Sequence, residues 1–321
     1  MATYGGIDLG GTKIQTVIVR GEDHSVLGQA RTLTPHEGGP PAVIDALVAC
    51  MSEAASAANL DVAHLDGVGV GAPGEVDMAA GTLARAGNLS EWERPVALAA
   101  TLAERLGVSA RLGNDVSVAT NAELLLGAGR GASSLLGVFW GTGVGGGVVL
   151  DGKLWHGRGD AGEIGHMVVK QGGARCMCGR RGCMEAYAGR RAMEAKAKRL
   201  VEKGHHTDLF KIMQERGRQT LSSGVWAHAL HHEDKLAQRL IERAVQALGS
   251  GVASAVNLLD VEMVLLGGGL GLRFGEPMLE RISAAMKPHL FKDEQPPTLR
   301  LAALGDLGGA LGAALLCATG P

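Results

Sequence analysis

The sequence has few cysteines, almost no net charge and no long apolar segment. Only five cysteines occur in 321 residues, which excludes the disulfide framework of secreted domains and indicates a reducing compartment. The 31 Lys and Arg against 33 Asp and Glu leave a formal charge of −2, which argues against a partner held chiefly by phosphate-backbone attraction. The first residues show neither the basic nor the apolar region of a secretion signal. We therefore expect a cytoplasmic protein with no nucleic-acid or membrane partner.

Glycine, in contrast, is abundant. The chain contains 50 glycines without a collagen-like period, and 46% of its residues are hydrophobic while 20% are charged. This composition predicts a well-buried core with many tight turns and close backbone approaches, as at phosphate-binding loops. An alanine- and glycine-rich background composition is the alternative explanation, so the placement of the glycines has to decide. A length of 321 residues is enough for two domains.

The hydrophobic pattern predicts an α/β protein that repeats itself. A three-stranded meander is predicted at residues 3–32, with further strands at 65–74, 109–115, 134–140, 148–152 and 261–266. Helices are predicted at residues 40–58, 94–107, 120–129, 235–260 and 307–318, and over most of 190–232. "IDLGGTKIQTVIV" and "GVFWGTGVGGGVVL" each open a half with a strand, a glycine turn and a returning strand. We predict two duplicated α/β lobes with a ligand cleft between them.

The lobe boundaries follow from this duplication. We expect a small N-terminal lobe over residues 1–120 and a larger lobe over residues 121–305. The C-terminal helix, within residues 306–321, is expected to pack back onto the first lobe.

Three glycine-rich turns follow predicted strands: "DLGGTK" (8–13), "WGTGVGGG" (140–147) and "LLGGGLG" (265–271). Glycine lets backbone N–H groups approach phosphate oxygens, and a neighbouring hydroxyl adds a donor. None of the turns has the spacing of a P-loop or of a dinucleotide-binding motif. Each turn alone could be a tight hairpin without a ligand, but the set favours a nucleotide site.

Two aspartates stand at the ends of predicted strands. Asp8 precedes the first glycine turn, where a carboxylate can hold Mg²⁺ beside phosphates or can simply cap the turn. Asp115 follows Asn114 just before a helix, where a carboxylate can act in catalysis or as a helix cap. The residues alone leave both alternatives open.

Three of the five cysteines form a C-x-C-x₄-C pattern, and a histidine lies ten residues before the first of them. Glycines between the thiols let the backbone fold them together, so the set predicts a closed structural zinc site with the ligands His166, Cys176, Cys178 and Cys183. A redox pair would need a C-x-x-C motif, and simple packing would need aliphatic periodicity. The paired histidines at 205–206 and 231–232 lack such neighbours, and we expect them to be solvated surface.

Seven segments occur in order from residue 7 to residue 269: "IDLGGTK", "GAPGEVD", "GNDV", "GTGVGGG", "GEIGH", "CMCGRRGCMEAYAG" and "LLGGG". Together they resemble the ROK family (repressors, open reading frames and kinases), most closely its bacterial ATP-dependent glucokinases, over nearly the whole chain. The resemblance implies a two-lobed actin-like (RNase H-like) ATPase fold with duplicated βββαβα lobes and a central cleft. It also implies ATP with Mg²⁺, a homodimer, and phosphorylation of the 6-hydroxyl of a hexose, foremost glucose to glucose 6-phosphate.

The resemblance assigns nucleotide contacts to the three turns. These would be Asp8, Gly10, Gly11, Thr12 and Lys13 in the first, Thr142 and Gly143 in the second, and Gly267, Gly268 and Gly269 in the third. Asp115 would be the general base that takes the proton from the sugar hydroxyl as it attacks the γ-phosphoryl group.

The resemblance also assigns the sugar contacts. Carboxylates and amides suit neighbouring hydroxyls, and the implied residues are Gly74, Asn88, Asn114, Asp115, Glu163, His166 and Glu185. His166 would bind zinc through one ring nitrogen and donate to the sugar from the other. On the residues alone, Glu163 and Glu185 would be solvent-exposed charges. Two departures are visible: "GNLSEW" lies where spacing varies between members, and "YAGRR" lacks the serine that often follows "EAYA" in glucokinases.

Two other classes of protein are alternatives to a sugar kinase. A sugar-responsive regulator would need a helix-turn-helix of about 60 residues before the core, and with a first strand starting at Tyr4 we expect none. An ATPase that only switches conformation would have no use for "GEIGH" and the cysteine motif. Among kinases, N-acetylglucosamine, N-acetylmannosamine, fructose or mannose are the alternative acceptors, and polyphosphate is the alternative donor.

Overall fold

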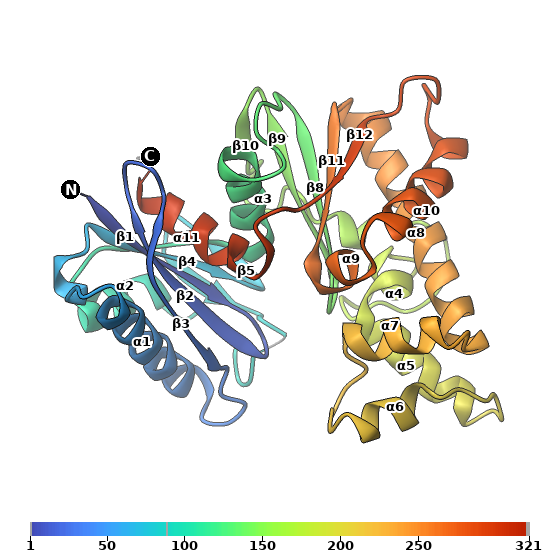
Figure 1. The fold of residues 1–321 in the computed structure, drawn as a ribbon, viewed down its shortest axis with the longest axis horizontal. Helices are drawn as coiled ribbons and strands as arrows, with labels where there is room; N and C mark the ends of the chain where they lie inside the picture. The colour runs from blue at the N-terminus through green and yellow to red at the C-terminus, as the bar shows by residue number, and fades with distance from the viewer. Residues whose placement is uncertain (1, 88, 319–321) are drawn as a thin grey trace. The chain divides into compact units, whose positions relative to one another are not determined.

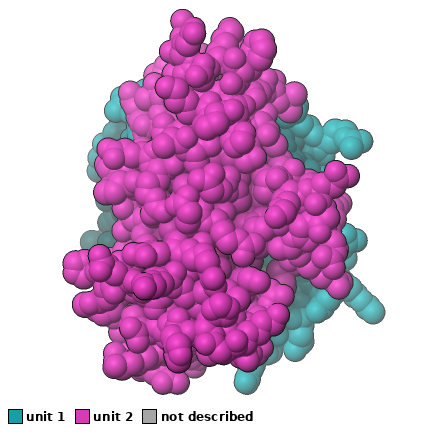
Figure 2. All heavy atoms as spheres, turned by 90° about the vertical axis from the view of Figure 1, so that its right-hand side faces the viewer, with its two compact units in different colours: residues 1–130, 154–161, 303–321 teal, residues 131–153, 162–302 magenta. Residues whose placement is uncertain are grey.

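The computed structural model describes residues 2–87 and 89–318. Its chain divides into two compact units, coloured separately in Figure 2: Met1–Arg130, Leu154–Ala161 and Ala303–Pro321 form unit 1, and Gly131–Lys153 and Gly162–Ala302 form unit 2. No helix among the described residues is both long enough and apolar enough to span a bilayer.

Unit 1 is built on a five-stranded sheet in the order β3-β2-β1-β4-β7. The first three strands are antiparallel, and β4 and β7 continue the sheet in parallel with β1. Its strands are β1 (Thr3–Leu9), β2 (Lys13–Arg20), β3 (Val26–Leu33), β4 (Gly67–Ala72) and β7 (Ala110–Asn114), with a separate hairpin of β5 (Glu75–Asp77) and β6 (Thr82–Ala84) (Figure 1). Its helices are α1 (Gly39–Ala57), α2 (Leu98–Leu106), α3 (Asp115–Leu126) and α11 (Gly308–Ala318).

Alternation along β2 gives the sheet of unit 1 two apolar faces. Ile14 and Ile18 join the core beneath α1 and α2, whereas Val17 and Val19 pack with α3 and α11. Helix α11 approaches the sheet backbone closely: a Cβ at Gly69 would lie 1.8 Å from the carbonyl oxygen of Ala313. Glycine in the strand is therefore required for this contact, and it explains part of the glycine excess.

Unit 2 repeats the same plan. Its sheet has the order β10-β9-β8-β11-β12, with β8 and β9 antiparallel and β11 and β12 parallel to β8. The strands are β8 (Leu135–Trp140), β9 (Val144–Leu150), β10 (Lys153–Trp155), β11 (Met263–Gly267) and β12 (Thr298–Leu301). The helices are α4 (Glu185–Ala188), α5 (Arg190–Val201), α6 (Leu209–Glu215), α7 (Ser223–His231), α8 (Lys235–Leu259), α9 (Gly268–Phe274) and α10 (Glu276–Met286). The predicted internal duplication is therefore confirmed in the strand order.

The long helix α8 supplies much of the core of unit 2. The predicted stripe along it is buried throughout, and consists of Leu236, Leu240, Ala244, Leu248 and Val252. This stripe packs with residues of β8 and α10 such as Val138 and Ile282.

Several predicted boundaries were wrong. The strand expected from residue 148 begins at Val144, so Gly145–Gly147 belong to β9 and not to a turn. Glycine is needed there because a Cβ at Gly146 would lie 2.7 Å from the carbonyl oxygen of Gly162. The helix expected from residue 120 begins at Asp115, and the third glycine turn runs directly into α9 at Gly268.

Candidate active site and metal centre

The first glycine turn joins β1 to β2 and is closed by hydrogen bonds. The N–H of Gly10 donates to the carbonyl of Lys13 at 3.0 Å, and the hydroxyl of Thr34 donates to the carbonyl of Gly10 at 2.6 Å. The side chain of Thr12 is exposed, and the ammonium of Lys13 lies 3.2 Å from the carboxylate of Asp306. The turn thus presents a hydroxyl and an ammonium, which are both donors to phosphate oxygens.

The carboxyl group of Asp8, near the end of β1, has a raised pKa. Burial and the nearby negative charge of Asp115 raise the pKa of Asp8 to about 7, although the Lys13 ammonium lowers it. Gly309 makes room for this carboxylate, since a Cβ at 309 would lie 2.7 Å from its carbon. Two neighbouring carboxylates with little compensating positive charge form a donor set that suits a divalent cation.

Asn114 and Asp115 form the junction between β7 and α3. The side-chain oxygen of Asn114 accepts hydrogen bonds from the N–H groups of Val116 and Ser117, both at 3.1 Å. Asp115 is the first residue of the helix, and its Oδ1 accepts from the N–H of Val116 at 2.8 Å. Asn114 is therefore the helix cap, and Asp115 is held where the helix N-terminus favours a negative charge.

The second glycine turn, residues 140–144, is hydrogen-bonded to the segment 185–191 at residues 140, 141, 142 and 144. The indole N–H of Trp140 donates to Ala188 at 2.6 Å, and the N–H of Val144 donates to the carboxylate of Glu185 at 2.9 Å. The N–H groups at 190 and 191 donate to the carbonyls at 141 and 142, at 3.1 and 3.2 Å. A Cβ at Gly143 would lie 2.2 Å from Glu185 Oε2, so a larger residue there would displace the carboxylate that accepts the N–H of Val144. The loop is held rigidly around its predicted phosphate donors.

The third glycine turn lies beside the second. Gly268 has a φ of +80°, and a Cβ there would lie 2.5 Å from the carbonyl oxygen of Trp140. A Cβ at Gly141 would lie 3.6 Å from the nitrogen of Gly269, which itself has open space around its α-carbon. Unit 2 therefore brings together the predicted residues Thr142, Gly143 and Gly267–Gly269, and a ligand can approach the backbone at 269.

Glu163 and His166 flank a short 3₁₀ turn, Ile164–His166. The Nε2 atom of His166 lies 3.7 Å from Glu163 Oε2, and the side chain of Glu163 is 53% exposed. The other ring nitrogen, Nδ1, points at Cys176, 3.7 Å from its sulfur. The histidine therefore has one nitrogen toward the thiols and one beside a carboxylate.

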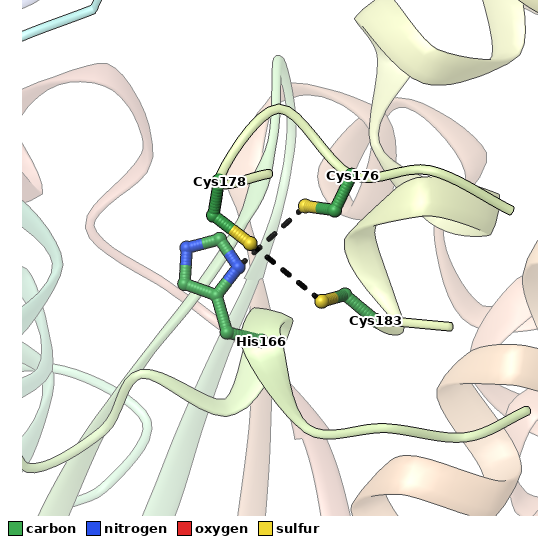
Figure 3. Close-up of side chains that lie close together, drawn as sticks. All are labelled: His166, Cys176, Cys178 and Cys183. Atoms are coloured by element: carbon green, nitrogen blue, oxygen red, sulfur yellow. Dashed lines mark hydrogen bonds between the residues drawn. The ribbon is translucent and has the colours of Figure 1, made fainter. Parts of the chain in front are cut away.

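The four predicted metal ligands converge, as Figure 3 shows. The ligand atoms of His166, Cys176, Cys178 and Cys183 all lie within 4.8 Å of one another, and the sulfurs of Cys178 and Cys183 are 3.7 Å apart. Tetrahedral Zn–S bonds of about 2.3 Å place two sulfurs about 3.8 Å apart, so the set fits that geometry. Burial raises the pKa of the Cys176 thiol to about 12, so its ionisation needs a cation.

The structure gives no further support for two of the predicted sugar-binding residues. Asn88 lies outside the described residues. Gly74 has a φ of +95°, and a Cβ there would lie 2.7 Å from the α-carbon of Ala86, so its conformation alone requires glycine.

Two charged residues that contact the glycine turns were not predicted from the sequence. Asp306 contacts Lys13, and Arg190 donates to the hydroxyl of Thr142 at 3.0 Å. Arg190 could have been noticed in the sequence, because two arginines follow "EAYAG" at the start of a helical stretch. No local signal pointed to Asp306, because almost three hundred residues separate it from the first turn.

Comparison with known proteins places these features in one family. Residues 4–319 match the model of the ROK family. The chain is 32% identical over 288 residues to a glucokinase of Thermotoga maritima, covering 88% of each chain. It is 33% identical over 322 residues to the N-acetylgalactosamine kinase AgaK of Shewanella sp. strain ANA-3, covering 98% of this chain and 96% of the relative.

A solved structure agrees with these sequence matches. The crystal structure of a ROK family glucokinase from Streptomyces griseus, in complex with glucose and AMPPNP, superposes with a TM-score of 0.83 at 29% identity. The match covers 99% of this chain and all of that one. The predicted actin-like α/β fold with two lobes is thereby confirmed.

Proposed function

The chain belongs to the ROK family and is a sugar kinase, and we propose that it transfers the γ-phosphoryl group of ATP to the 6-hydroxyl of glucose. The observation that carries this proposal is the position of Asp115 at the start of α3, close enough to the half-buried Asp8 for its charge to raise the pKa of that carboxyl group. The related glucokinases favour glucose as the acceptor.

Asp115 is the proposed general base. A carboxylate that is held by the N–H of Val116 at 2.8 Å keeps one orientation and can accept the proton of an attacking hydroxyl. Phosphoryl transfer needs chiefly positioning and neutralisation of charge, so one well-placed carboxylate is sufficient as the base.

The glycine turns are the proposed nucleotide contacts. Gly11 offers a backbone donor, while Gly10 closes the turn by donating to the carbonyl of Lys13. Thr12 and Thr142 offer hydroxyls, and Lys13 offers a positive charge to the phosphates. Lys13 would exchange Asp306 for a phosphate oxygen. Mg²⁺, with Asp8 as its proposed protein carboxylate, would neutralise phosphate charge when ATP is bound.

The proposed sugar contacts are Asn114, Glu163, His166 and Glu185, with Gly74 and Asn88 as further candidates. The Cys₃His set is proposed to hold a structural zinc ion, which would keep Glu163, His166 and Glu185 in place. With Nδ1 of His166 toward the thiols, Nε2 is the nitrogen left to face a sugar hydroxyl. We also propose a cytoplasmic location and a homodimer, from the resemblance alone.

The related N-acetylgalactosamine kinase gives a second candidate function, phosphorylation of an N-acetylhexosamine. A coupled assay of ADP release decides between the two, with glucose, mannose, fructose, N-acetylglucosamine, N-acetylgalactosamine and N-acetylmannosamine as acceptors. We expect the highest kcat/KM with glucose. A higher value with an acetamido sugar would establish the second candidate. Absence of ADP release with every sugar would overturn the proposal and favour a regulator.

A further inference from the structure

Arg190, the first residue of α5, joins that helix to two other segments of unit 2, the second glycine turn and residues 220–221. Its Nη2 donates to the hydroxyl of Thr142 at 3.0 Å in the second glycine turn. Its Nη1 donates to the hydroxyl of Thr220 at 3.2 Å and to the carbonyl of Leu221 at 3.3 Å. Its backbone N–H donates to the carbonyl of Gly141 at 3.1 Å.

These contacts are specific to a guanidinium. The group is planar and carries donors in a fixed fork, so it can reach Thr142 and the 220–221 segment at the same time. The side chain is half-buried, and burial lowers the pKa of Arg190 while the carboxylate of Glu194 opposes this effect. Glu194 also accepts the N–H of Leu221 at 2.9 Å, so the segment that Arg190 holds is itself anchored to α5.

The direction of the hydrogen bond to Thr142 matters for a ligand. A guanidinium can only donate, so the hydroxyl oxygen of Thr142 must be the acceptor in this pair. The hydroxyl proton is then directed away from Arg190 and is available to another acceptor. In a loop whose backbone is fastened by α4 and α5, that acceptor would be a phosphate oxygen of the nucleotide.

We propose that Arg190 is a positioning residue for phosphoryl transfer, which orients the hydroxyl of Thr142 toward the nucleotide phosphates and holds the second glycine turn in place. The inference rests on the proposed kinase function. It predicts a larger effect on nucleotide binding than on sugar binding, because within residues 2–87 and 89–318 the side-chain hydrogen bonds of Arg190 reach the second glycine turn and residues 220–221 and no proposed sugar residue.

The test uses Arg190→Ala, Arg190→Lys and Thr142→Val, with Arg199→Ala as the matched control. Arg199 lies on the same helix, is exposed, and donates through Nε only to Ala195 within that helix, at 3.2 Å. For each variant we would measure KM for ATP, KM for glucose, and the Kd of AMPPNP without sugar by calorimetry.

We expect Arg190→Ala to raise KM for ATP and Kd for AMPPNP about tenfold, since a hydrogen bond from a charged group is lost. KM for glucose should stay within about twofold, and Arg199→Ala should resemble the wild type in all three values. Arg190→Lys should recover only part of the loss, because one ammonium cannot span the three partners. Added guanidinium, well below denaturing concentrations, should improve AMPPNP binding by Arg190→Ala.

A double-mutant cycle gives the sharpest outcome. If Arg190 acts through the Thr142 hydroxyl, the variant with both Arg190→Ala and Thr142→Val should bind AMPPNP no more weakly than the worse single variant. Fully additive losses, or an unchanged Kd in Arg190→Ala, would overturn the inference while leaving the kinase function intact. A wild-type chain that binds AMPPNP without sugar-dependent ADP release would instead contradict the proposed function. If Arg190→Ala does not fold, Arg190→Lys and Thr142→Val still complete the cycle.

Discussion

The backbone N–H of Val144 donates to the carboxylate of Glu185 at 2.9 Å. Glu185 begins α4 only two residues after Cys183, so one short segment carries a proposed metal ligand and a support of the second glycine turn. The opposite oxygen of Glu185 lies 3.8 Å from the sulfur of Cys176. A change in the cysteine cluster should therefore affect the second glycine turn, the proposed phosphate loop, as well as the proposed sugar residues.

Asp115→Asn should abolish most turnover. The amide oxygen still accepts the N–H of Val116, so the start of α3 stays intact, but the amide cannot take the proton of the sugar hydroxyl. We expect kcat to fall by about 10²–10⁴-fold, with the Kd for glucose changed little. Asp61→Asn is the control, because Asp61 also accepts a backbone N–H at a helix start, that of Ala63 at 3.0 Å, and is not among the proposed site residues. A kcat near that of the wild type would disprove the role of Asp115.

Cys178→Ala should release the metal and weaken sugar binding. Metal analysis of the wild type should find about one zinc per chain, because the four ligands form one closed set. The variant should lose this zinc, and its KM for glucose should rise by about tenfold or more, as for loss of support around a site. Cys317→Ala removes a thiol from α11 outside the cluster and should keep both the zinc and the KM. A zinc-free Cys178→Ala variant with the wild-type KM would contradict the link.

Asp8 should make the stability of the free chain depend on pH. Its pKa is raised from 3.8 to about 7 in the folded chain, so between these values the folded state binds more protons than the unfolded state. The free energy of unfolding should therefore fall as pH rises from about 4 to about 7, by at most roughly 4 kcal/mol from this group. Asp8→Asn should remove this slope, so the variant should be more stable than the wild type at pH 8 although inactive.

Denaturant unfolding at several pH values, without Mg²⁺ or nucleotide, measures this effect. Asp23→Asn is the control of opposite sign, since hydrogen bonds from Ser25 lower the pKa of that exposed carboxyl. A stability difference between wild type and Asp8→Asn that does not change with pH would contradict the prediction.

Gly69→Ala should destabilise unit 1. The added Cβ would lie 1.8 Å from the carbonyl oxygen of Ala313, a backbone atom that cannot rotate away, so α11 must shift from the sheet. We expect a loss of about 2 kcal/mol or more in the free energy of unfolding. Gly224→Ala, in α7, is the control, because the nearest atom that a Cβ there would meet, Arg216 Nη1, is 3.6 Å away, an ordinary van der Waals distance. Equal Tm values for the two variants would show that the close approach of α11 is not needed.

Much of the fold was predictable from local patterns. The stripe at Leu240, Leu248 and Val252 predicted α8, and the repeated strand–turn–strand pattern predicted the duplication. The cysteine cluster was predictable because its ligands fall within eighteen residues, between His166 and Cys183, where spacing and glycines limit the chain's path. The boundary at Val144 was not, since Gly145–Gly147 are as typical of a turn as of a closely packed strand.

The order of residues is enough to predict the succession of helices and strands, the three glycine turns and the four proposed metal ligands, because these depend on neighbours along the chain. Packing in three dimensions brings Arg190 and Glu185 to the turn at 140–144, and it places Asp8 and Asp115, both half-buried, close enough for their charges to interact. Those properties arise from contacts between residues far apart in sequence. The hydrogen bonds depend on the distances between these residues, and the pKa of Asp8 depends on its burial and on nearby charges. These distances and this burial are fixed only when the sheets and helices pack together.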